Sequence, residues 1–141
     1  MRVVRYSVAD KEVWDAFVGR SKNATFLLKR DYMDYHADRF PDHSLMLYDD
    51  SGELVTLLPA TVRGDVLSSH TGLTYGGFVM TDTTSGVDPL WWFDAVRAYC
   101  REQGFSALIY KPVPHIYHRQ PSDEDLYALF RNGAALTVRN L

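Results

Sequence analysis

The sequence has a single cysteine, Cys100, no long apolar run and no strong excess of charge of either sign. One cysteine cannot form a disulfide within the chain, which fits a reducing compartment. No apolar segment approaches the ~18 residues needed to cross a bilayer, and the charged N-terminal segment lacks the apolar core of a secretory signal. A net charge of -3 gives no overall field that attracts DNA or anionic membranes. We therefore expect a cytoplasmic protein with no membrane span and no DNA partner.

The chain has 141 residues, the length of one ordinary domain, and we expect a single domain over residues 1–141. Patterns typical of strands alternate with patterns typical of helices, which predicts an α/β or α+β fold. Strands are expected at residues 2–8, on either side of the turn Asp50-Ser51-Gly52, next to a second turn at Gly64-Asp65, and at residues 73–80, 105–111 and 135–141.

Capping signals place the helices. Ser7 with Asp10, and Ser122 with Asp125, match the capping box that precedes a helix. A third helix is expected to have Asp88 as its N-cap and to end at Gly104. The second helix is expected over residues 29–40, and the fourth ends at Gly133. The acidic run of residues 123–125 is interpreted as complementing the dipole of the fourth helix.

Three strings carry a resemblance to a known family: "SHTGLTYGG" at residues 69–77, "YKPVPHIYHRQPSDEDLYALFRNGA" at 110–134, and "WDAFVGRSKNATFLLKRDYMDYHADRF" at 14–40. With the order of elements, they resemble the N-terminal half of Fem-type (FemAB-like) acyltransferases, which are built from two tandem GNAT-like halves. The resemblance implies a GNAT-like mixed, twisted sheet flanked by helices and lacking its final strand. The first two helices would lie on one side and the third on the other, and strands 73–80 and 105–111 would diverge near Gly77 and Pro112.

The resemblance also implies a division of labour. The second half usually binds the acyl donor, an acyl-CoA or an aminoacyl-tRNA, and the first half holds the acceptor, often a peptidoglycan precursor or another cell-envelope glycan. We therefore expect no cofactor in this chain, a small-molecule, glycan or peptide acceptor, and a second GNAT-like half as partner. The chemistry would be attack of an acceptor amine on the bound acyl group.

The usual phosphate cradle for CoA is missing from the sequence. A GNAT domain holds the CoA pyrophosphate on backbone N–H groups before its third helix, at a pattern of Arg or Gln, two residues, Gly, one residue, then Gly or Ala. The corresponding stretch here is "GGFVMTDTTSGVDPLWW", with Asp82 and Asp88 in place of a basic residue. Pro89 removes one N–H donor. We expect this chain not to bind CoA at the usual place.

Polar residues gather where strands 73–80 and 105–111 end, which is where substrates lie in sheets of this kind. Gly76 and Gly77 leave room for a ligand backbone or form a bulge. Lys111 and Arg119 are able to hold a phosphate or carboxylate, or are solvated surface charges. The substrate-binding candidates are His70, Tyr75, Gly76, Gly77, Lys111, Tyr117 and Arg119, where the two tyrosines either stack on a sugar or base or belong to the core.

His115 and His118 are the candidates for a general base. Their H-x-x-H spacing, with His70 as a third ligand, permits zinc, but no acidic residue or cysteine completes the pattern and we expect no metal. Two other functions stay open: a stand-alone CoA-dependent N-acetyltransferase, against which the missing cradle argues, and a non-catalytic binding module. The last predicted strand, "ALTVRNL", lacks a neighbour to cover its outer edge, which predicts an edge-strand homodimer or a frayed C-terminus.

Overall fold

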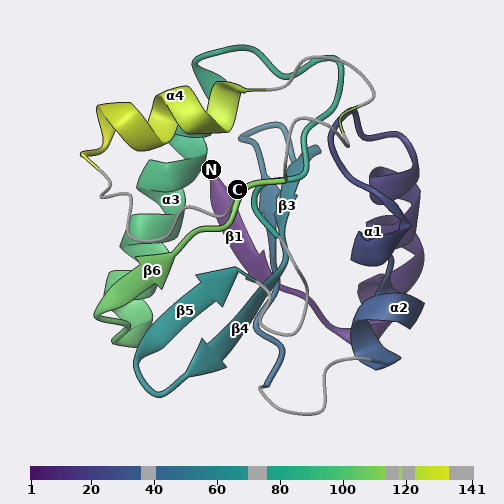
Figure 1. Ribbon diagram of the computed structural model, residues 1–141, viewed down its shortest axis with the longest axis horizontal. Helices are drawn as coiled ribbons and strands as arrows, with labels where there is room; N and C mark the ends of the chain where they lie inside the picture. The colour runs from purple at the N-terminus through teal and green to yellow at the C-terminus, as the bar shows by residue number, and fades with distance from the viewer. Residues whose placement is uncertain (36–40, 70–75, 114–117, 119–122, 134–141) are drawn as a thin grey trace, which may run out of the picture.

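The computed structural model describes residues 1–35, 41–69, 76–113, 118 and 123–133. Helices flank two three-stranded sheets (Figure 1). The first sheet is antiparallel, in the order β1 (Arg2–Arg5), β2 (Leu45–Tyr48) and β3 (Leu54–Leu58). The second contains β4 (Ala60–Arg63), β5 (Val66–Ser69) and β6 (Ala107–Ile109), and β6 runs parallel to β5. The predicted mixed α/β class is confirmed.

The helices lie on both faces of the first sheet, with α1 (Lys11–Gly19) and α2 (Arg30–Tyr35) on one side and α3 (Asp88–Gln103) and α4 (Glu124–Arg131) on the other (Figure 1). Two short 3₁₀ turns, Val8–Asp10 and Phe26–Leu28, precede α1 and α2. Among the described residues, no helix is long and apolar enough to span a membrane.

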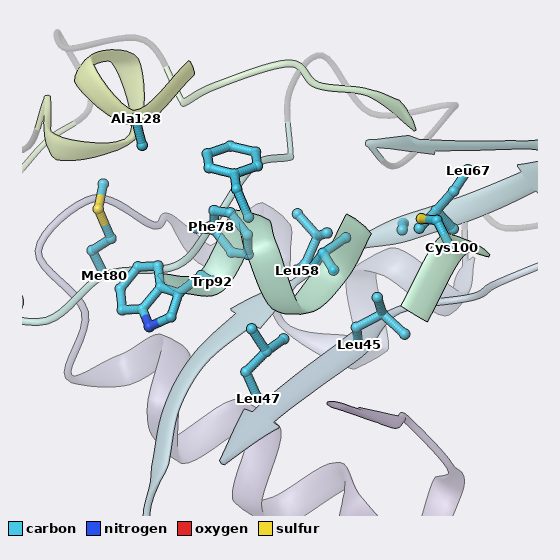
Figure 2. Packing of buried hydrophobic residues seen from close by; sticks show 12 residues of the cluster. Leu45, Leu47, Leu58, Leu67, Phe78, Met80, Trp92, Cys100 and Ala128 are labelled. Carbon is cyan, nitrogen blue, oxygen red and sulfur yellow. The ribbon is translucent and has the colours of Figure 1, made fainter. Parts of the chain in front are cut away.

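Strand alternation in β2 divides the core into two clusters. Met46 packs with Trp14 of α1, whereas Leu45 and Leu47 pack with Trp92 of α3. Figure 2 shows the second cluster, in which Leu45, Leu47 and Leu58 of the first sheet gather around the α3 residues. Because successive side chains of a strand point to opposite faces, a central strand between helices must be apolar on both sides, as "LMLY" is.

Arg30, at the start of α2, contacts the first core cluster, on the face of the sheet that α1 and α2 cover. Its guanidinium lies 3.9 Å from the ring centroid of Tyr6 and 5.0 Å from that of Trp14. It also pairs with Asp34 at 2.7 Å and Asp42 at 3.1 Å, and the residue is 2% exposed. A buried cation of this kind is tolerated because carboxylates and aromatic faces surround it. Arg30 thereby joins the residue that follows β1 to α1 and α2.

Several local predictions are confirmed. The Ser7–Asp10 capping box is present, and Gly104 ends α3 in the left-handed conformation. The Asp50-Ser51-Gly52 turn joins β2 to β3, where the Asp49 carboxylate accepts the N–H groups of Ser51 and Glu53. The turn at residues 64–65 joins β4 to β5.

Other predictions need correction. Residues 76–80 of the predicted strand 73–80 make a single bridge, between Val79 and Leu57, and no regular strand. The strand expected at 105–111 is reduced to β6, whose residues are exposed or half-buried. Asp88 lies inside the first turn of α3, because Val87 is the N-cap. The predicted helix segment 36–40 and the predicted strand 135–141 lie outside the described residues.

Candidate functional site

The segment that follows Gly76 lies against the end of β6. The N–H of Gly76 donates to the carbonyl of Lys111 at 3.0 Å, and the N–H of Lys111 donates to the hydroxyl of Ser69 at 2.9 Å. The N–H of Phe78 donates to the hydroxyl of Tyr110 at 2.7 Å. These hydrogen bonds hold the two segments together as far as Gly76 and Lys111. Beyond Gly77 the N–H of Val79 donates to Leu57 of β3, and the divergence of strands 73–80 and 105–111 near Gly77 and Pro112 stays a prediction.

Gly77 allows a close approach, but by the chain itself. Its φ is +77°, and a Cβ placed on it would lie 3.0 Å from the Tyr110 hydroxyl and 3.2 Å from the Cα of Pro112. An L-residue with a side chain is strained at this φ and crowded by its neighbours. Tyr110 and Pro112 occupy the space beside Gly77 that the sequence analysis assigned to a ligand backbone.

Tyr110, His118, Glu124 and Asp125, which we call the strand-end site, surround the beginning of α4. The Tyr110 hydroxyl donates to Asp125 at 2.7 Å, and Asp125 is 3% exposed. Burial raises the pKa of the Asp125 carboxyl to about 6, against the opposing effects of the hydrogen bonds from Tyr110 and the Leu126 N–H and of the nearby His118. Burial, and then the charge of Asp125, raise the pKa of Tyr110 well above its ordinary value. The hydroxyl therefore keeps its proton and donates a hydrogen bond to the carboxylate.

Glu124 forms an ion pair with Lys22, which lies in the segment after α1. Lys22 is 6% exposed. The Lys22 ammonium lies 2.7 Å from Oε1 of Glu124. The backbone N–H of Lys22 also donates to the carbonyl of Met80 at 2.8 Å. This ion pair ties the start of α4 to the α1 side of the molecule.

Two buried acceptor atoms of the site lack a donor within the described part of the chain. Oε2 of Glu124 is one, because Lys22 contacts only the other oxygen. Nδ1 of His118 is the second. Its Nε2 lies 2.9 Å from the carbonyl of Val113, and since a carbonyl only accepts, Nε2 carries a hydrogen. When the ring is neutral, Nδ1 therefore carries the lone pair.

The structure describes four of the candidate residues from the sequence. His118 belongs to the strand-end site. Gly76 and Lys111 contribute backbone hydrogen bonds beside it, and the Lys111 side chain is exposed. Gly77 packs on Tyr110. Five other candidates lie outside the described residues: His70, Tyr75, His115, Tyr117 and Arg119.

Sequence reasoning missed Tyr110, Lys22, Glu124 and Asp125. The acidic run was assigned to the helix dipole, and Asp125 to a capping box, yet the Asp125 carboxylate lies buried against Tyr110. A signal existed: Asp125 precedes Ala128 by three positions and therefore lies on the buried face of α4. A carboxylate on an apolar helix face calls for a buried partner.

A hollow of about 400 Å³ lies at the N-terminus of α3, which we call the α3 hollow. Four carboxylates line it, and Arg20 and the N-terminal residue are the basic groups beside them. The carboxylate of Asp88 accepts the N–H of Ser85 at 2.9 Å. The lining carboxylates are Asp49, Glu53, Asp82 and Asp88, and the apolar lining includes Phe17, Leu54, Val55 and Trp92.

No family model and no curated protein matches the chain. A mutant of TTHA1254 from Thermus thermophilus is similar in structure, with a TM-score of 0.55 and 17% identity over 100% of this chain and 94% of that one. A mutant of BH1408 from Bacillus halodurans is also similar, with a TM-score of 0.53 and 12% identity over 100% of this chain and 97% of that one. At these identities the likeness extends to the fold alone.

Proposed function

We propose that this chain holds the amine acceptor of an acyl-transfer reaction, as the acceptor-binding half of a Fem-type acyl- or aminoacyl-transferase that acts on a cell-envelope or glycan precursor. The observation that carries the proposal is that, within the part of the chain that the structure describes, Oε2 of Glu124 and Nδ1 of His118 are each buried without a hydrogen-bond partner. A cytoplasmic location belongs to the same proposal, because acyl-CoA and aminoacyl-tRNA are cytoplasmic molecules.

An amine is the group that such a site would take. A buried acceptor left without a donor costs about 1–3 kcal/mol, which a ligand that donates recovers. A protonated amine offers three donors, and the carboxylates of Glu124 and Asp125 supply opposite charge. The site also lies where parallel strands β5 and β6 end, the usual location of ligands in sheets with parallel strands.

The α3 hollow supports an acceptor role over a stand-alone CoA-dependent acetyltransferase. A CoA pyrophosphate needs free N–H groups and positive charge at the helix N-terminus. Here Asp82 and Asp88 line that place, and Pro89 supplies no N–H. The acyl donor, an acyl-CoA or an aminoacyl-tRNA, would be supplied by a second GNAT-like half.

The reaction that fits this arrangement is aminolysis of an activated ester. The bound ammonium first loses one proton, for which the Nδ1 lone pair of a neutral His118 is available. The neutral nitrogen then forms a bond to the acyl carbon, and the bond from that carbon to the sulfur or oxygen of the donor breaks. The nitrogen loses its second proton, and the leaving thiolate or alkoxide gains it. Positioning of the amine supplies the rest of the catalytic effect from this half.

The test uses a peptidoglycan stem peptide with a free lysine amine and a copy acetylated on that amine, each titrated into the chain by calorimetry. Acetylation removes the charge and two of the three donors, and we expect binding to weaken at least about tenfold. Glu124→Gln should weaken the free-amine peptide, whereas Glu102→Gln, an exposed position on α3, should not. Equal affinity for the two peptides, or no binding of either, contradicts the proposal.

A further inference from the structure

A groove of about 350 Å³ lies between α3 and the end of α4, on a different surface from the strand-end site. Residues from α3 form one wall, and the last residues of α4 and its C-cap form the other. The lining residues are Val87, Leu90, Trp91, Asp94, Arg131 and Asn132.

The rim of this groove is apolar and open to solvent. Val87 is 57% exposed and Trp91 is 62% exposed, and their spacing of four residues puts them on one side of α3. An exposed tryptophan beside an exposed apolar side chain at a groove is typical of a surface that a partner covers.

The two charges of the groove are opposite and do not pair with each other. Among the described residues, Asp94 makes no ion pair and Arg131 has no carboxylate partner. The Arg131 guanidinium donates to the hydroxyl of Tyr127 at 3.0 Å and lies 5.9 Å from the centroid of that ring, so its described partner carries no opposite charge. One acid and one base on the same apolar patch make that patch complementary to itself, which is what a two-fold symmetric interface requires.

We propose that this groove between α3 and α4 binds a second copy of this chain, with Arg131 of each copy facing Asp94 of the other and with Val87 and Trp91 between them. The interface is distinct from pairing at a strand edge. Burial of Val87 and Trp91 would supply affinity, and the two reciprocal charge pairs would fix the orientation.

Sedimentation of the full chain from about 5 μM to about 1 mM tests the proposal, a range that covers interfaces of modest affinity. The wild type should dimerise with increasing concentration. Asp94→Arg puts two positive charges in each groove, Arg131→Asp puts in two negative charges, and each variant alone should raise the dimer Kd at least about tenfold. Mixing the two variants restores both charge pairs and should restore the dimer.

Both altered positions are exposed, so circular dichroism should show an unchanged fold, and Glu102→Arg, an equal charge change at the far end of α3, should leave the dimer intact. The mixture of the two variants distinguishes this interface from a general effect of charge on association. If the copies met through another surface, mixing the variants would not restore the dimer. A wild type that stays monomeric at the highest concentration, or a dimer that survives Asp94→Arg through another surface, overturns it.

Discussion

The hydroxyl of Tyr110 donates a 2.7 Å hydrogen bond to the carboxylate of Asp125 and accepts the N–H of Phe78, also at 2.7 Å. This one side chain therefore joins the end of β6 to α4 and to the segment beside Gly77. The carboxylate it meets is 3% exposed, so the connection carries an electrostatic cost that depends on pH.

Asp125→Asn should make stability less dependent on pH. The folded-state pKa of Asp125 is about 6, raised above its ordinary value of 3.8, so the folded chain binds the proton more tightly than the unfolded chain. The contribution of this group is fully present below about pH 4 and is lost as pH rises through about 6, a change of about 3 kcal/mol. The stability difference, Asn variant minus wild type, should therefore rise by about that amount between pH 4 and pH 7 in urea denaturation.

Asp123→Asn is the matched control, because Asp123 precedes the same helical turn and is exposed. Asparagine at position 125 still presents an oxygen to the Tyr110 hydroxyl, so the fold is retained. If wild type and Asp125→Asn lose stability in parallel across this pH range, burial of the carboxylate carries no cost and the account of this pair is wrong.

Gly77→Ala should destabilise the fold more than Gly64→Ala. Both glycines have positive φ, +77° and +61°, and a side chain costs roughly 1–2 kcal/mol at such angles. Only Gly77 has close neighbours, Tyr110 and Pro112, whereas nothing lies within 4 Å of a Cβ at Gly64. We expect an additional loss of about 1–3 kcal/mol for Gly77→Ala, measured by chemical denaturation. Equal losses for the two variants would show that the close packing around Gly77 is absent.

Lys22→Met should lower the free energy of unfolding by about 2–3 kcal/mol, because it leaves the largely buried Glu124 carboxylate without its ammonium partner. This loss is at or below the lower end of the range for a broken buried ion pair. Adding Glu124→Gln to that variant should restore part of the loss, since it removes the unpaired charge. The exposed pair of Lys11 and Asp31 has the same 2.7 Å separation and provides the comparison. Lys11→Met should lower stability much less than Lys22→Met, because exposed ion pairs contribute little, and an equal loss for both lysines would contradict the role of burial.

The parts of the fold that local chemistry determines could be predicted from the sequence. A capping box acts within four residues, as at Ser7 and Asp10, and a turn or a helix end needs one residue of suitable conformation, as at Gly52 and Gly104. Helices on both faces of the sheet were what the family resemblance implied, and the apolar strand β2 between them agrees with that arrangement.

The strand-end site could not be predicted in this way, because its interactions are between distant residues. Asp125 meets Tyr110 across 15 positions, and Glu124 meets Lys22 across 102. The capping pattern alone explained an aspartate at position 125, so its burial was not predicted. Gly77 was correctly associated with a close approach, but no local pattern distinguishes a ligand from the chain's own Tyr110.

Whether this chain serves the acceptor and not the acyl donor is tested most directly by titrating it with acetyl-CoA in a calorimeter. The carboxylates Asp82 and Asp88 line the place where a pyrophosphate would bind, and Pro89 offers no N–H there. We predict that acetyl-CoA binds no more tightly than about 1 mM. Micromolar binding, with a complex that shows the pyrophosphate at the start of α3, would contradict the account.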